Sequence, residues 1–185
     1  LCLCLGLPAC SAGDVLREEG LFYEAGGISP DAVLMTIDDR EIPAWRYLYW
    51  LVYTCDYIRT SYEKEGQELD WEAPLADGTL ADYAAEQALR NTALYATVEN
   101  WAVQYEVELT EEDRTAMEAD WAEKTSYYGS EEAYLQALQD MGLTRTEAET
   151  MSGDYYLYSH LYDLSCQEGS ELYPAAEDVA AFAED

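Results

Sequence analysis

The sequence is poorest in basic side chains and in histidine. Nine lysine and arginine residues stand against 39 aspartate and glutamate residues, and the only histidine is His160. The formal net charge is therefore -30. A chain with this charge repels the phosphates of nucleic acid and the anionic face of a membrane. We therefore exclude nucleic acid as a partner.

The residue patterns of common catalytic and cofactor sites are also missing. His160 lies inside a predicted helix, and no Ser–His–Asp or Cys–His pairing, clustered zinc ligands or glycine-rich phosphate loop accompanies it. The acidic runs Glu111–Asp113 and Glu131–Glu132 are typical of helix first turns, and Asp38–Asp39 of a hairpin turn. The sequence predicts no catalytic residue, no metal ligand and no cofactor.

The remaining composition is that of a folded protein. Hydrophobic residues make up 49% of the 185 residues and aromatic residues 13%, with 17 tyrosines and five tryptophans. Disordered acidic chains have few such residues. The length corresponds to about one domain and allows burial of ~70% of the surface that the unfolded chain exposes.

The first ten residues resemble the end of a bacterial lipoprotein signal peptide. They carry no charge, and the segment Leu7-Pro8-Ala9-Cys10 resembles a lipobox, whose cysteine becomes the lipidated first residue of the mature protein. This assigns 1–10 to a signal peptide remnant, Cys10 to lipidation and 11–31 to a tether. The expected location is extracytoplasmic, at the bacterial cell membrane. The alternative is a buried N-terminal strand with incidental cysteines.

The lipoprotein interpretation leaves two cysteines in the folded part, Cys55 and Cys166. Outside the cytoplasm they could form a disulfide, which would stabilise the fold by about 4–5 kcal/mol in the chain-entropy model. Alternatively, both are small hydrophobic residues on helices.

The pattern of apolar and capping residues predicts a mainly α fold: a helical bundle with long, extended helices and a small N-terminal β-hairpin. The hairpin pairs 33–37 with 40–42 through the turn at Asp38–Asp39, and Pro43 opens the first helix. A loop follows over 65–78. Helices are expected at 44–64, 79–105, after Thr110, from Ser130 to Gly142, at 144–166 and at 175–185.

Aromatic side chains are concentrated on the first and fifth of these helices. Tyrosine and tryptophan suit surfaces that are partly wet and partly apolar, so a groove lined by them could hold unfolded polypeptide without strict sequence demands. The acidic surroundings would favour basic clients. Candidate polypeptide-binding residues are Tyr49, Trp50, Tyr53, Tyr57, Tyr95, Trp101 and Tyr158. The alternative is that these residues pack in the core.

The order of these features resembles the N-terminal chaperone region of PrsA/SurA-type extracytoplasmic foldases. The resemblance rests on the lipobox, the spaced Val33, Ile37, Asp38 and Ile42, the long aromatic helix, Leu109–Glu112 and Gly142–Thr144. It implies a SurA/PrsA-like helical chaperone domain over 32–173 and the start of a linker helix over 174–185. In many members a parvulin-type prolyl isomerase domain with two histidines follows, and this chain carries no such site.

Together these features predict a membrane-anchored chaperone module that binds unfolded or nascent secreted polypeptides. Two alternatives remain open. The chain could be the non-catalytic part of a prolyl isomerase whose catalytic domain is absent here. It could also be a structural or adhesion lipoprotein that binds one specific partner.

Overall fold

A computed structural model describes residues 20, 24 and 26–177. The predicted lipobox with Cys10 and most of the predicted tether lie outside the described residues. Of the described residues, 66% are helical, and the predicted mainly α fold class is confirmed. None of the described helices combines the length and apolarity needed to cross a membrane.

The N-terminal hairpin pairs β1 (Val33–Ile37) with β2 (Arg40–Pro43). Its two turn residues, Asp38 and Asp39, both have positive φ values, 49° and 64°. Two consecutive left-handed residues match the twist of the flanking strands, and aspartate tolerates this conformation better than most side chains. The backbone N–H groups of Ala44 and Trp45 donate to the carbonyls of residues 32 and 30 at 2.8 and 3.0 Å. The end of the predicted tether, at Pro30, and the residue that follows the tether, Ala32, are thus fixed to the start of the first long helix.

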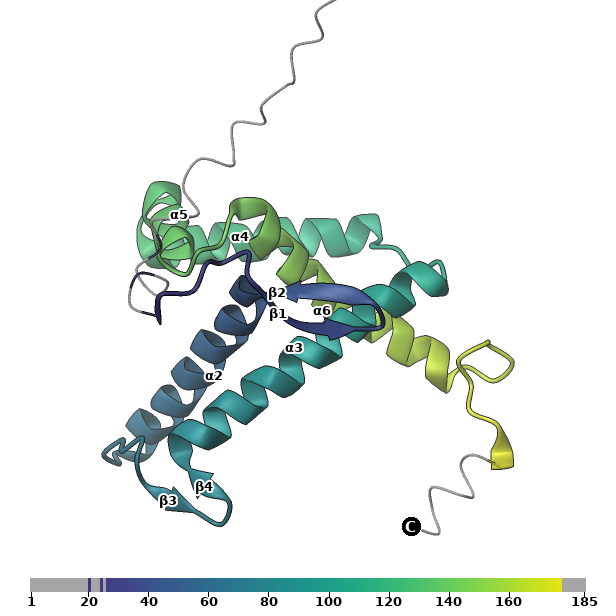
Figure 1. Ribbon diagram of the computed structural model, residues 1–185. Helices are drawn as coiled ribbons and strands as arrows, with labels where there is room; N and C mark the ends of the chain where they lie inside the picture. Colours follow the sequence, from purple (N-terminus) through teal and green to yellow (C-terminus); the bar gives the residue numbers. More distant parts are fainter. Residues whose placement is uncertain (1–19, 21–23, 25, 178–185) are drawn as a thin grey trace, which may run out of the picture.

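The helices α2 (Ala44–Glu65) and α3 (Leu80–Gln104) form an antiparallel pair (Figure 1). Between them lies a short ladder of β3 (Pro74–Leu75) and β4 (Gly78–Thr79), where the sequence predicted only a loop. Thr79 caps α3 together with Asp82 in a capping box, which satisfies backbone N–H groups at the start of the helix.

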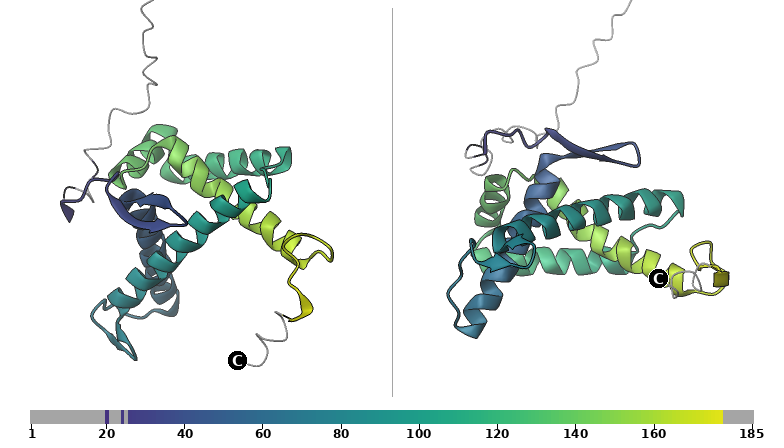
Figure 2. Two further views of the ribbon diagram at one scale, coloured as in Figure 1. Left: turned by 45° about the vertical axis from the view of Figure 1, so that its right-hand side comes forward. Right: turned by 60° about the horizontal axis from the view of Figure 1, so that its bottom comes forward.

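Three further helices complete the fold: α4 (Glu111–Tyr128), α5 (Glu131–Asp140) and α6 (Arg145–Cys166). Their predicted N-caps Thr110, Ser130 and Thr144 all accept a backbone hydrogen bond. The helix α6 crosses α3, and both α4 and α5 pack against α6 (Figures 1 and 2). Ala176 and Glu177 are helical, and the rest of the helix predicted at 175–185 lies outside the described residues.

The buried apolar residues form three separate clusters. The largest joins the first half of α2 to α3, α5 and α6 around Trp45, Trp50 and Met151. A second cluster at the far end of the α2–α3 pair contains Ile58 and Leu80, and a third joins α3 to the outer part of α6 around Val98 and Leu161. The long helices therefore extend beyond the main core, each with a local core of its own.

Candidate functional site

Trp50 forms the buried base of an aromatic cluster. Only 8% of Trp50 is exposed, and its indole stacks on the ring of Tyr95 with centroids 4.6 Å apart and planes inclined by 11°. Tyr49 and Tyr53 meet the indole edge-on at 5.2 and 5.5 Å. Both geometries are favourable for aromatic pairs. Trp50 belongs to the core and supports the neighbouring tyrosines from beneath.

The cluster continues from α3 onto α6. The rings of Tyr95 and Tyr158 lie 6.3 Å apart, and those of Tyr158 and Tyr162 lie 6.5 Å apart. Tyr155 lies one turn before Tyr158 on the same helix. Burial and the neighbouring Tyr158 raise the pKa of the Tyr95 hydroxyl. We use the name tyrosine surface for the set Tyr53, Tyr95, Tyr155, Tyr158 and Tyr162.

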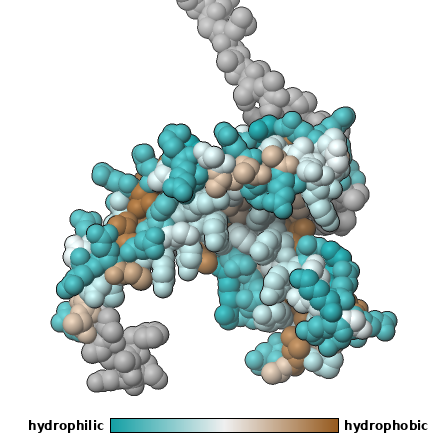
Figure 3. Space-filling view, turned by 180° about the vertical axis from the view of Figure 1, so that it is seen from behind, coloured by the Kyte–Doolittle hydropathy of each residue, from teal (hydrophilic) through white to brown (hydrophobic). Residues whose placement is uncertain are grey.

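Most of the tyrosine surface is open to solvent. Tyr53 is 56% exposed, Tyr155 and Tyr162 are slightly more exposed, and Tyr158 and Tyr95 are partly covered. The three helices that carry these residues border the hollow visible in Figure 3 between the far end of the α2–α3 pair and the outer end of α6. Within the described residues, no lysine or arginine stacks on these rings, since the two cation–π contacts there involve Trp45 and Trp121.

Helix periodicity explains the exposed tyrosines of α6. Tyr155, Tyr158 and Tyr162 follow i, i+3, i+7 spacing and share one face. Met151, one turn before Tyr155 on the same face, is buried in the main core, so this face becomes exposed only where α6 extends beyond that core. Tyr155 and Tyr162 extend the set predicted from the sequence. The spacing alone predicts the shared face, but it does not show where along α6 that face leaves the core.

Two of the predicted residues lie apart from this cluster. Tyr57 is exposed one turn beyond Tyr53 and makes no ring contact with any described residue. Trp101 lies beside Tyr105 and lines a cavity near the hairpin with Asp38 and Arg40, away from the other candidates. The structure therefore joins Tyr49, Trp50, Tyr53, Tyr95 and Tyr158 and leaves these two separate.

A buried group of charged side chains lies where α2, α3 and α6 meet. Arg46 on α2 is 2% exposed and forms an ion pair with Glu99 on α3, which also pairs with Arg40. The Arg46 Nη2 atom lies 3.5 Å from Oδ2 of Asp154 on α6, a residue that is 1% exposed. We call Arg40, Arg46, Glu99 and Asp154 the ionic junction.

The ionic junction perturbs the acidity of its members. Burial raises the pKa of Asp154 to about 6, although Arg46 and Arg40 oppose this shift. Burial also lowers the pKa of Arg46. The Nη1 atom of Arg46 is buried without a hydrogen-bond partner among the described residues. These charges act on the packing of three helices, and the sequence patterns singled out none of them.

His160 links two helices. Its Nε2 atom lies 2.8 Å from Oδ2 of Asp113 and donates a hydrogen bond to that carboxylate, which ties α6 to the start of α4. Hydrogen bonds from Thr110 and His160 lower the pKa of Asp113 to about 2. An ionised Asp113 can then cap α4 and hold His160 at the same time.

The structure bears on two further kinds of site, a metal site and a reactive cysteine. In the part of the chain that the structure describes, no group of three or more His, Cys, Asp or Glu residues is arranged to hold a metal ion. Cys55 on α2 is half-buried and Cys166 at the end of α6 is exposed, and both are free thiols. Burial raises the pKa of Cys55, which makes it less reactive.

Comparison of the chain with protein-family models, with curated proteins and with solved structures finds no match in any of the three.

Proposed function

We propose that this protein is a membrane-anchored extracytoplasmic chaperone that binds unfolded secreted polypeptides on the tyrosine surface. The observation that carries the proposal is the set of neighbouring tyrosines around the buried Trp50, in which Tyr95 of α3 stacks on the indole and the members on α2 and α6 are exposed. Binding is noncovalent and needs no nucleotide.

Tyrosine is well suited to clients of varied sequence. Its ring offers a large apolar face with few rotatable bonds, and its hydroxyl can donate to or accept from a polypeptide backbone. The rings of Tyr95 and Tyr158 are already held by neighbouring aromatic rings, so binding orders few additional side chains.

The charge of the protein selects among clients. With a formal net charge of -30, the surface attracts unfolded chains rich in lysine and arginine and repels other copies of itself. Seven of the eight lysine and arginine residues within the described range lie at the surface. Most of these seven form ion pairs with adjacent carboxylates. Little positive charge therefore opposes a basic client.

The proposed location rests on the N-terminal sequence. The lipobox-like segment ending in Cys10 supports attachment to the outer face of a bacterial membrane. The resemblance to the N-terminal region of PrsA/SurA-type foldases supports the same compartment and the same class of client. A lipid anchor would hold the chaperone where secreted chains emerge unfolded.

Suppression of aggregation tests the function. Several unrelated proteins with basic or acidic net charge are diluted from denaturant with and without the purified chain, and light scattering is followed. We expect suppression that is strongest for the basic clients. Suppression of none of them, together with tight binding of one folded partner, would favour the adhesion alternative.

A protease-coupled prolyl isomerisation assay on the same chain tests the enzyme alternative. No acceleration above the uncatalysed rate is expected, because the described residues offer no paired histidines or other catalytic set. Clear turnover would contradict a chaperone that acts by binding alone.

A further inference from the structure

A second cavity, separate from the tyrosine surface, lies between α4 and α6. Its volume is about 650 Å³, which lies within the usual range of pockets for small ligands. Leu109, Met117, Trp121 and Ala148 give it an apolar wall, and Tyr134 of α5 closes one side.

The charge balance of this cavity differs from that of the chain as a whole. Three basic residues line it, Arg114, Lys124 and Arg145, out of the eight that lie within the described residues. Three acidic residues line it as well, whereas acidic residues outnumber basic ones 39 to nine over the whole sequence. An anion is therefore repelled less here than over most of the surface.

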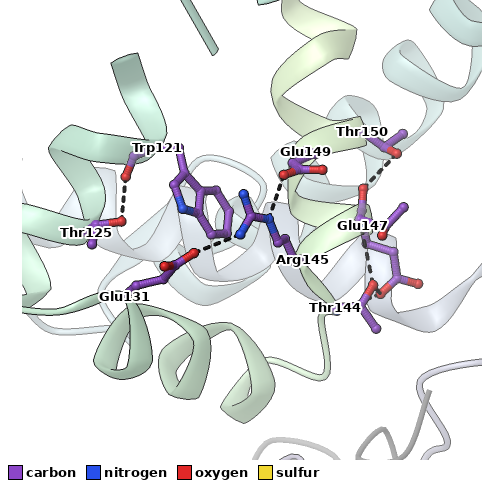
Figure 4. Close-up of polar contacts among 9 residues, drawn as sticks. Trp121, Thr125, Glu131, Thr144, Arg145, Glu147, Glu149 and Thr150 are labelled. Atoms are coloured by element: carbon purple, nitrogen blue, oxygen red, sulfur yellow. Dashed lines mark hydrogen bonds and ion pairs between the residues drawn. The ribbon is translucent and has the colours of Figure 1, made fainter. Parts of the chain in front are cut away.

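Arg145 and Trp121 form a rigid part of the wall (Figure 4). The guanidinium of Arg145 donates to Glu149 at 2.8 Å and to Glu131 at 2.7 Å, and it lies over the Trp121 ring at 4.4 Å from the centroid. The Trp121 ring in turn lies 4.9 Å from that of the buried Tyr134. A ligand that contacts this wall orders few additional side chains.

Among the three basic residues of the cavity, Arg114 is the one whose guanidinium N–H groups have no partner among the described residues. It forms no ion pair and no side-chain hydrogen bond with any residue that the structure describes. By contrast, Lys124 is paired with Asp120, and Arg145 has two carboxylate partners. The planar guanidinium of Arg114 can therefore bind a carboxylate through two parallel hydrogen bonds.

We propose that this cavity binds the C-terminal end of a polypeptide. The terminal carboxylate pairs with Arg114, and the last apolar side chain packs on Met117 and Trp121. The hydroxyls of Thr146, Thr150 and Ser152, together with Glu118, accept the backbone N–H groups of the peptide. The site is separate from the tyrosine surface, so either proposal can fail without the other.

Two other anionic ligands fit the cavity less well. The second negative charge of a phosphate group would be repelled by Glu118, Asp120 and Glu149. A simple fatty carboxylate has no N–H donors, so it would leave the acceptors of the cavity without partners. A peptide supplies a single negative charge, an apolar side chain and several N–H groups.

Calorimetric titration of the full chain with three probes tests this assignment. The probes are acetyl-Ala-Ala-Leu as the free acid, the same peptide as its C-terminal amide, and hexanoate. We expect the free acid to bind at least about tenfold more tightly than either other probe. The amide loses the charged hydrogen-bonded pair with Arg114, and hexanoate lacks the backbone N–H groups of the peptide. Equal binding of the amide, or of hexanoate, overturns the proposal, and so does a free acid that does not bind.

Matched charge variants locate the site. Arg114→Gln should weaken binding of the free acid by about tenfold. Lys64→Gln removes another exposed and unpaired cation, at the far end of α2, and should leave the affinity unchanged. The indole N–H resonance of Trp121, assigned with Trp121→Phe, should shift on titration. Equal losses in the two charge variants, or an unmoved Trp121 resonance, would place the peptide elsewhere.

Discussion

The tyrosine surface and the largely buried residues of the ionic junction, Arg46, Glu99 and Asp154, lie on the same three helices, yet they have opposite relations to solvent. Asp154 is 1% exposed, and the adjacent Tyr155 is among the most exposed tyrosines of α6. Likewise, Glu99 of the junction lies one helical turn after Tyr95 of the surface. The junction fixes how α2, α3 and α6 cross, and this crossing brings tyrosines from distant parts of the chain together. Variants of the two regions should therefore affect different quantities: junction and core variants the stability, and surface variants the binding.

Replacement of Trp50 and of Tyr53 by alanine gives the sharpest contrast. Trp50→Ala should lower the free energy of unfolding by about 3–5 kcal/mol, because it opens a cavity in the main core. Tyr53→Ala, three residues away and 56% exposed, should change stability little and weaken client binding instead. Urea denaturation and a client-binding titration on both variants measure the two effects. A Trp50→Ala variant as stable as the wild type would contradict the assignment of Trp50 to the core and of Tyr53 to the binding surface.

Removal of the central cation of the ionic junction should have the next largest effect. Arg46→Ala leaves Glu99 and Asp154 buried with less compensation, and we expect a loss of about 3 kcal/mol in the free energy of unfolding. Arg59→Ala is the control, since Arg59 pairs with Asp56 and Glu63 on the exposed side of the same helix. If both variants were equally stable, the junction would not hold the helices together.

The pH dependence of stability reports on Asp154. Its pKa rises from 3.8 to about 6 on folding, so the folded state binds the proton more tightly than the unfolded state. The contribution of Asp154 to stability is therefore greatest below about pH 4, and about 1–3 kcal/mol of it is lost as the pH rises to about 6.

The variant Asp154→Asn isolates this effect. An amide mimics the protonated acid, so the variant should gain stability relative to the wild type between about pH 4 and pH 7. Denaturation curves at several pH values provide the measurement. A relative gain by the wild type over the same interval would mean that Arg46 outweighs burial and lowers the pKa of Asp154.

The smallest effect is expected at Tyr57. This residue is exposed but has no aromatic neighbour among the described residues, so Tyr57→Ser removes an isolated ring. Tyr158→Ser interrupts contacts to both Tyr95 and Tyr162. Binding titrations should show a clear loss for Tyr158→Ser and little change for Tyr57→Ser. Similar losses would extend the binding region along α2 toward its C-terminal end.

Local signals in the sequence were sufficient for the elements themselves. Thr79, Thr110 and Thr144 start helices where a hydroxyl precedes an acidic residue by three positions, and the turn at Asp38–Asp39 joins the two strands as predicted. Each of these features depends on residues close together in the chain. The short β3–β4 ladder was missed because two-residue strands carry no periodicity.

Features that depend on contacts between distant residues could not be predicted. Arg46, Glu99 and Asp154 are more than 50 residues apart in sequence, and each alone looks like one charged residue of a helix. The burial of Trp50 could not be predicted either. Apolar residues cover most of α2, and which side of this helix faces the core depends on where α3 and α6 pack. The structure thus separates the aromatic candidates into the buried Trp50 and the tyrosine surface above it.

The most direct test of the central claim is the affinity for an unfolded, basic client when the tyrosine surface is removed. Fluorescence anisotropy of a labelled, permanently unfolded polypeptide compares the wild type with Tyr53→Ser/Tyr158→Ser and with Tyr127→Ser. Tyr127 is 86% exposed on α4, a helix that carries no residue of the tyrosine surface, and serves as the control for loss of an exposed tyrosine. We predict that the double variant binds at least about tenfold more weakly while its unfolding midpoint is preserved, and that Tyr127→Ser binds like the wild type. Equal affinities of all three proteins would contradict binding on the tyrosine surface.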